Sequence, residues 1–201
     1  MSKRAFIVHG WDGSPDKDWL PWLRTELMTA GFEVRAPLLP NAETPHIETW
    51  VPALAEAVGT ADSDTYFVGH SMGCQTIIRY LASLPEGIAV GGAVFVAGFV
   101  KQLTHEDGGL LTETEDEEQR MIAKEWLEIP LDLNAVHAHL PKGVAILSDN
   151  DPYVPLEEQT HFRDGLGSTI VIEHGKDHFN GEDGITELPS ALDAVLRLSA
   201  K

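Results

Sequence analysis

The chain has 201 residues, of which 43% are hydrophobic and 23% are charged, a composition typical of one globular domain. Its formal net charge of −18 repels the phosphates of nucleic acids and of anionic membrane surfaces, which excludes both classes of partner from our expectations. The single cysteine, Cys74, has no partner for an internal disulfide, and no stretch is long and apolar enough for a signal peptide or a membrane span, so we expect a cytoplasmic protein.

Short apolar runs alternate with longer helical patterns along the chain, as is typical of βαβ units. Hydrophobic spacing and the Gly and Pro positions predict strands at 5–8, 32–36, 66–68, 90–96, 144–147 and 169–172, and helices at 18–30, 48–58, 72–84 and 186–199. We therefore expect an α/β fold class, with one domain over residues 1–201. Its architecture would be a three-layer α/β/α sandwich around a mostly parallel sheet of about six strands.

Residues 100–140 interrupt this alternation. They have no strand pattern and are acidic around Glu113 to Glu118. Two interpretations are open for this segment, either a solvated helical connection or helices that cover a site. The acidic composition favours the solvated connection.

Residues 69–73 read Gly-His-Ser-Met-Gly, a G-x-S-x-G pattern between a predicted strand and a predicted helix. In such a turn the serine takes a strained conformation at the carboxyl edge of the sheet, and the glycines let strand and helix pass closely. The Met72 backbone N–H would lie at a helix N-terminus, where free donors and the helix dipole stabilise an oxyanion. The pattern predicts Ser71 as a nucleophile, with a plain helix cap as the alternative.

A second oxyanion donor is expected in the loop after the first strand, which reads His9-Gly10-Trp11. The predicted donor is the Trp11 backbone N–H, so its side chain is not needed for this role. The alternative for His9-Gly10 is a turn that merely ends the strand.

A serine hydroxyl needs a base, and in this arrangement the chain order is Ser, then acid, then His on loops after late strands. His178 follows the last predicted strand and is the expected base, with His174 as the alternative. His70 is expected to point away from the nucleophile. His137 and His139 form an H-x-H pair, but no strong set of metal ligands accompanies them, so no metal is expected.

The acid is expected after the strand at 144–147, where Asp149 and Asp151 compete. Asp151 begins a D-x-x-V-P turn that Pro152 stiffens, so it is the predicted orienting acid. Asp149 is the alternative, and the aspartate that is not the acid would be a turn former.

These residues make the chain similar to the small α/β-hydrolases of the retinoblastoma-binding-protein-9-like serine hydrolase family. The similarity runs through most of the chain and rests on V-H-G-W at 8–11, W-L-P-W-L at 19–23, P-L-L-P-N at 37–41, G-H-S-M-G at 69–73, D-P-Y-V-P at 151–155 and D-H-F-N at 177–180. It implies a compact α/β-hydrolase fold with Ser71, Asp151 and His178 as nucleophile, acid and base. The family's histidine usually follows a glycine, whereas Asp177 precedes it here, so the resemblance does not fix this loop's conformation.

We therefore expect a carboxylesterase-like serine hydrolase that cleaves small carboxylic esters through an acyl-enzyme, with a small-molecule substrate and no cofactor. The alternatives are a non-catalytic binding module on the same scaffold, and a thioesterase or acyltransferase. Trp11, Trp19, Trp22 and Trp50 are interpreted as packing residues that could instead wall a pocket. Cys74 is interpreted as a buried, inert thiol.

Overall fold

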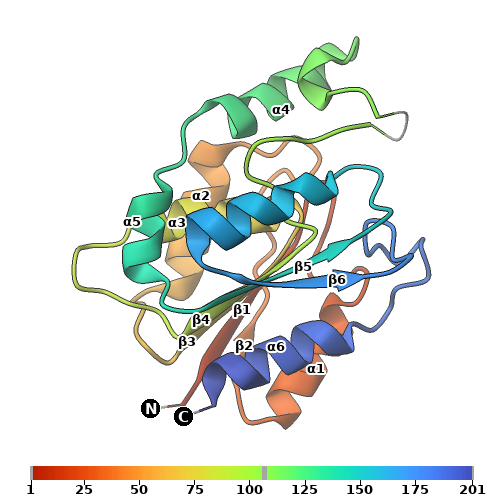
Figure 1. Ribbon diagram of the computed structural model, residues 1–201. Helices are drawn as coiled ribbons and strands as arrows, with labels where there is room; N and C mark the ends of the chain where they lie inside the picture. The colour runs from red at the N-terminus through yellow and green to blue at the C-terminus, as the bar shows by residue number, and fades with distance from the viewer. Residues whose placement is uncertain (1, 106–107, 201) are drawn as a thin grey trace.

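One six-stranded sheet forms the centre of the molecule (Figure 1). The computed structural model describes residues 2–105 and 108–200. Its strands are β1 (Arg4–Val8), β2 (Glu33–Arg35), β3 (Thr65–His70), β4 (Gly92–Val96), β5 (Gly143–Ser148) and β6 (Thr169–Glu173). Their order is β2-β1-β3-β4-β5-β6, and each adjacent pair is parallel, so the predicted α/β class is confirmed.

Helices cover both faces of the sheet, as the alternating pattern predicts. One face carries α1 (Leu20–Thr29) and α6 (Pro189–Ser199), and the other carries α2 (Ile47–Val58), α3 (Met72–Ala82) and α5 (Leu133–His139) (Figure 1). The predicted strands and helices all form, with ends within three residues of the expected positions. No helix in residues 2–105 and 108–200 is both long and apolar enough to cross a bilayer.

Two hydrophobic cores lie on opposite faces of the sheet because side chains alternate along each strand. In β3, Phe67 packs in the core beneath α2 and α3, while Tyr66 and Val68 pack in the core beneath α1 and α6. A parallel strand covered on both faces needs apolar residues at successive positions. This requirement explains why the central strands read as continuous apolar runs rather than as alternating ones.

The segment at 100–140 contains α5 and a further helix, α4 (Glu117–Glu128), which lies apart from the sheet beyond the carboxyl ends of the strands (Figure 1). Asp116 caps α4 by accepting a hydrogen bond from the Gln119 N–H at 3.0 Å. The buried Trp126 indole of α4 donates to the Pro45 carbonyl at 2.9 Å. The Glu125 carboxylate accepts from the Ile47 N–H at 2.7 Å. These contacts hold α4 against the N-terminal end of α2.

Candidate active site

Ser71 occupies the sharp turn between β3 and α3. Its φ of 51° and ψ of −119° lie in a region that side-chain-bearing residues rarely adopt. The Ser71 N–H donates to the Val96 carbonyl at 2.9 Å, which ties the turn to the neighbouring strand β4. The turn therefore places the serine at the carboxyl edge of the sheet, as the G-x-S-x-G pattern predicts.

The glycines on either side of Ser71 are required by close contacts. A Cβ atom at Gly73 would overlap the Val8 carbonyl oxygen, and one at Gly69 would lie 2.8 Å from the Cys74 nitrogen. Both contacts are with backbone atoms, which cannot rotate away as side chains do. The strand-to-helix turn can therefore form at this position only if both residues lack a Cβ.

The loop after β1 lies directly over Ser71. A Cβ placed on Gly10 would be 3.1 Å from the Ser71 Cβ. The Gly10 carbonyl accepts hydrogen bonds from His9 Nδ1 at 2.8 Å and from the Gly13 N–H at 3.1 Å. Since carbonyl and N–H point in opposite directions across a trans peptide, these bonds orient the Trp11 N–H. That N–H donates to no backbone carbonyl of residues 2–105 and 108–200.

His9 has a defined protonation state. The Leu39 N–H donates to His9 Nε2 at 3.0 Å, so Nδ1 carries the proton that the Gly10 carbonyl accepts. The ring is 1% exposed, and burial lowers the pKa of His9 below its usual value. A neutral His9 therefore joins this loop to the chain after β2, a role that the sequence analysis did not assign to it.

His178 and Asp151 meet at the carboxyl edge of the sheet, as predicted. His178 Nδ1 lies 2.8 Å from Asp151 Oδ2 and 3.0 Å from Oδ1. The Asp151 side chain is only 2% exposed, and its Oδ1 also accepts from the Tyr153 and Val154 N–H groups at 2.9 and 3.0 Å. These donors fix the orientation of the carboxylate towards the imidazole.

The two alternatives, His174 and Asp149, pair with each other at the surface. His174 Nδ1 lies 2.6 Å from Asp149 Oδ2, and the His174 side chain is 84% exposed. This pairing raises the pKa of His174 and lowers the pKa of Asp149. The pair is separate from the residues that line the pocket described below.

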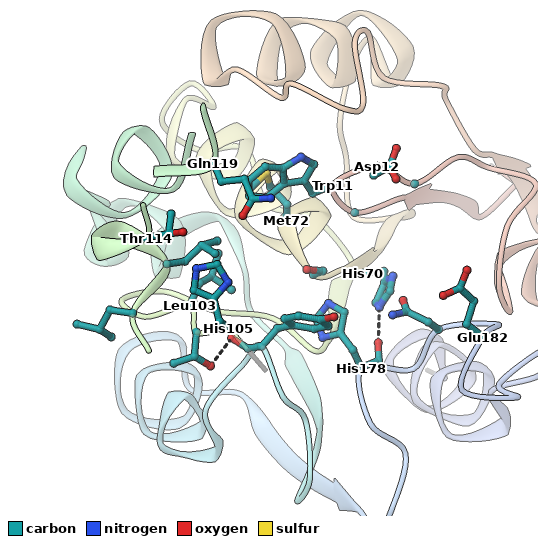
Figure 2. Close-up of a pocket in the computed structure, with 18 of the residues that line it drawn as sticks. Trp11, Asp12, His70, Met72, Leu103, His105, Thr114, Gln119, His178 and Glu182 are labelled. Carbon is teal, nitrogen blue, oxygen red and sulfur yellow. Dashed lines mark hydrogen bonds between the residues drawn. The ribbon is translucent and has the colours of Figure 1, made fainter. Parts of the chain in front are cut away.

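We expected His70 to point away from the nucleophile, but it lines the same pocket and contacts His178. Its ring centroid lies 5.1 Å from that of His178, and its Nε2 lies 2.8 Å from the His178 carbonyl oxygen (Figure 2). Burial lowers the pKa of His70 to about 4, and the neighbouring His178 adds to this shift. The expectation was wrong because the alternation of β3 places His70 on the same face as Val68, against Trp19, where His178 also contacts its ring.

A pocket of about 1300 Å³ opens over these groups (Figure 2). Ser71 and His178 line it together with His70, Met72 and Trp11. One side is formed by part of the 100–140 segment, here called the wall segment, with the lining residues Leu103, Thr104, His105, Gly109, Leu110, Leu111, Glu113, Thr114, Glu115 and Gln119. These contacts support the interpretation that the segment borders a site, rather than the solvated connection that its composition favours.

The wall segment is anchored to the loop that carries Asp151. The Thr104 N–H donates to the Tyr153 carbonyl at 2.8 Å, and the Thr104 hydroxyl donates to the Pro152 carbonyl at 2.9 Å. Just before the wall segment, the Val100 and Lys101 N–H groups donate to the carboxylate of the buried Glu158, which belongs to η2 (Leu156–Glu158). The pocket wall therefore begins at a point fixed to the acid loop.

Carboxylates outnumber cations in the pocket. Lys17 is the one lysine or arginine among the described lining residues, and its Nζ donates to the Asp12 carbonyl at 2.8 Å. The lining carboxylates are Asp12, Asp18, Glu113, Glu115 and Glu182. Their fields favour neutral or cationic molecules over anionic ones.

The tryptophans and Cys74 lie mainly in or against the hydrophobic cores. Trp19 and Trp50 are buried in the two cores, Trp22 packs against the core beneath α1, and Trp11 both lines the pocket and donates from its indole to the Glu43 carbonyl. Cys74 is buried against the Val96 carbonyl, and burial raises the pKa of its thiol.

The H-x-H pair was not expected to bind a metal. His139 Nδ1 lies 2.7 Å from the Ile88 carbonyl oxygen. Among residues 2–105 and 108–200, no three His, Cys, Asp or Glu side chains form a group that could hold a metal ion.

Two curated proteins that are similar to this chain are named as hydrolases. A curated relative, the putative hydrolase YdeN of Bacillus subtilis (strain 168), is 29% identical over 202 residues, with 100% of this chain and 98% of the relative covered. The serine hydrolase RBBP9 of Rattus norvegicus is 26% identical over 184 residues, with 90% and 89% covered.

Solved structures with the same fold are also similar to this chain. The crystal structure of the ydeN gene product superposes with a TM-score of 0.87 at 26% identity, with 100% of both chains covered. Est1E from Butyrivibrio proteoclasticus reaches a TM-score of 0.72 at 15% identity, with 100% of this chain and 89% of that chain covered, a likeness of fold alone. The expected α/β-hydrolase fold is therefore confirmed. The model of the family described as serine hydrolase matches residues 5–197, almost the whole length. The chain therefore belongs to the serine hydrolase family.

Proposed function

We propose that this protein is a serine esterase that cleaves small carboxylic esters, with Ser71 as nucleophile, His178 as general base and Asp151 as the acid that orients the base. The observation that carries the proposal is that His178, held by Asp151 through a hydrogen bond of 2.8 Å, lines the same pocket as a serine with φ of 51°. A base oriented by a carboxylate, together with a serine that lines the same pocket as the base, is the arrangement that nucleophilic acyl transfer requires.

The proposed reaction has two halves. His178 removes the Ser71 proton as the hydroxyl oxygen attacks the ester carbonyl, and the N–H groups of Trp11 and Met72 stabilise the oxyanion. The imidazolium then gives its proton to the leaving alcohol, which leaves an acyl-enzyme that water cleaves by the same route. Asp151 stays ionised throughout. Each oxyanion donor of this kind contributes about 3–4 kcal/mol to the transition state.

The pocket favours an uncharged ester with an apolar portion. Leu103, Leu110 and Leu111 supply apolar surface on the wall segment, while the five lining carboxylates disfavour anionic substrates. Among proteins with the same fold is a carboxylesterase of Nitrososphaera gargenis, which superposes with a TM-score of 0.71 at 15% identity. That likeness extends to the fold, so the choice of an ester substrate rests on the pocket.

The test is covalent labelling with a fluorophosphonate, an electrophile that reacts with the activated serine of serine hydrolases. Intact mass spectrometry of the parent protein and of Ser71→Ala should show one adduct on the parent and none on the variant. Hydrolysis of a series of p-nitrophenyl esters of increasing acyl length would then define the preferred substrate. A folded parent that takes up no probe and cleaves no ester would contradict the proposal and would favour a binding module on this scaffold.

A further inference from the structure

His70 is packed between the candidate base and the core. It is the last residue of β3, it is 4% exposed, and its ring contacts Trp19 on one side at a centroid distance of 5.8 Å. On the other side the ring lies 5.1 Å from that of His178. Its Nε2 is 2.8 Å from the backbone oxygen of His178, as the dashed line in Figure 2 marks. The residue before the nucleophile therefore contacts the residue proposed as the base.

The direction of this hydrogen bond follows from its chemistry. A backbone carbonyl can only accept, so Nε2 of His70 must carry the hydrogen. Burial disfavours a second proton on Nδ1, because the charged ring would be desolvated and would face His178. Asp18 and Asp151 are the anionic groups whose fields oppose this effect. His70 is thus a neutral donor with its proton on the nitrogen that faces the base loop.

The loop around His178 does not adopt its conformation by local preference. Asp177 and Phe179, on either side of the histidine, have φ angles of 45° and 60°, in the left-handed region that glycine favours. Their side chains are held separately, Asp177 by Asn150 and Phe179 by complete burial in the core. The hydrogen bond from His70 holds the backbone of His178 itself.

We propose that His70 is a positioning residue, which holds the His178 carbonyl so that the imidazole stays on Asp151 and faces the pocket. This inference rests on the proposed function, because positioning matters only if His178 acts as a base. Without the donor, the peptide after His178 could rotate, and the ring would leave the geometry that proton transfer needs. A displacement of about 1 Å in such a group costs about 100-fold in rate.

The experiment compares two nearly isosteric variants that differ in the donor. His70→Gln keeps an N–H at the reach of Nε2, and His70→Met fills similar space without one. His174→Gln is the matched control, because His174 is exposed and lies outside the pocket. For each protein, the kcat and KM for a neutral p-nitrophenyl ester and the rate of fluorophosphonate labelling are measured. Unfolding in urea verifies that each variant is folded.

The expected result is a fall in kcat of about 100-fold for His70→Met with little change in KM. His70→Gln should recover most of this loss, and His174→Gln should match the parent. A labelling rate for folded His70→Met equal to the parent's would overturn the proposal. An equal loss in the Gln and Met variants would also overturn it, because the donor would then have no part in the effect. If His70→Met does not fold, His70→Phe takes its place, since it retains the ring contact with Trp19.

A second readout separates this inference from the proposed function. The His178 Nδ1 proton, held by Asp151, gives a downfield NMR signal that requires no turnover. If the parent is inert towards both probe and ester but the signal is present in His70→Gln and absent in His70→Met, the esterase proposal fails, although His70 does hold the His178 imidazole on Asp151. If the parent is active and the signal is unchanged in all variants, the esterase proposal stands and the positioning role fails.

Discussion

Asp177 and Asn150, the residues that precede His178 and Asp151, are joined by two hydrogen bonds. The Asp177 N–H donates to Asn150 Oδ1 at 3.0 Å, and Asn150 Nδ2 donates to Asp177 Oδ1 at 2.7 Å. Asp177 has a φ of 45° at the position where the resembling family usually has glycine. Aspartate tolerates this region better than most residues, and the two bonds offset part of the remaining strain. They also link the loop of the base to the loop of the acid.

Replacing Asp177 therefore tests how the base loop is held. Asp177→Gly should relieve the strain while losing one hydrogen bond, so its free energy of unfolding should remain within about 1 kcal/mol of the parent's. Asp177→Val should destabilise the protein by about 1–3 kcal/mol, because a β-branched side chain is disfavoured at positive φ. Urea unfolding of the three proteins measures both differences. Equal stabilities for the Gly and Val variants would show that the backbone is not strained at this position.

The two aspartates that compete in the sequence should differ sharply in their effect on activity. Asp151→Asn should reduce kcat by about 10³–10⁴-fold, since the amide can no longer stabilise the imidazolium or fix its tautomer. Asp149→Asn should retain nearly full activity, because Asp149 pairs with the exposed His174. Ester hydrolysis by both variants gives the comparison. A large loss in Asp149→Asn alone would reverse the assignment of the acid.

The glycine after the nucleophile should tolerate no side chain. In Gly73→Ala the new methyl group would meet the Val8 carbonyl oxygen, and strand β1 or helix α3 would have to move. We expect a loss of about 1–3 kcal/mol in the free energy of unfolding and a much slower labelling of Ser71. Gly87→Ala gives the comparison, because the space around Gly87 is open and any loss of stability there comes from its positive φ, which Gly73 does not share. A fully stable and reactive Gly73→Ala would contradict the close approach.

The protein should lose stability in mild acid partly because of His70. A histidine in the unfolded chain takes up a proton near its ordinary value of 6.5, whereas burial lowers the pKa of His70 to about 4. Between these pH values the unfolded state binds more protons, so the free energy of unfolding falls as the pH drops. The difference in stability between the parent and His70→Met should therefore shift in favour of the variant from about pH 7.5 to about pH 5. Urea unfolding at both pH values measures it, and a difference independent of pH would refute the assignment of a neutral His70.

The charge of the pocket predicts a preference among esters of equal size. A neutral ester should react faster than an anionic one with the same acyl group, and added salt should narrow the gap because it screens the carboxylates. Glu182→Gln should narrow it too, whereas Glu187→Gln, outside the pocket, should not. The ratio of kcat/KM values for the two esters is the quantity to compare. An anionic ester that reacts as fast as the neutral one would show that the lining carboxylates do not reach the substrate.

The strands, the main helices and the placement of Ser71, Asp151 and His178 at one edge of the sheet were predictable, because each follows from the residue pattern of a short stretch of chain. Apolar periodicity marks the parallel strands, and the carboxyl ends of parallel strands converge at one edge. The choice between Asp149 and Asp151 depended on the residues of the turn, and the structure pairs Asp151 with His178.

The contributions of His9 and His70 could not be derived in the same way. Both bonds that fix His9 involve backbone groups, one of them 30 residues away, and the partner of His70 is a carbonyl 108 residues away. Backbone partners leave no mark in residue types. The wall segment was ambiguous for a related reason, since acidic residues are compatible both with solvent and with a pocket rim. A hint was available in the short apolar run of Leu110 and Leu111, which a fully solvated connection would not need.

Thr104 has a consequence for how this protein could diversify. Its two hydrogen bonds to the acid loop anchor the start of the wall segment. The contacts of α4 with the chain before α2 anchor the stretch that follows it. Between these fixed ends lies no residue of the proposed triad, so the chain there can be exchanged if the core residues Leu111, Ile122 and Ala123 are kept. Grafting a different stretch between Thr104 and Trp126 would therefore reshape what the pocket admits while the reaction itself stays the same, which makes this interval the natural target for altering selectivity.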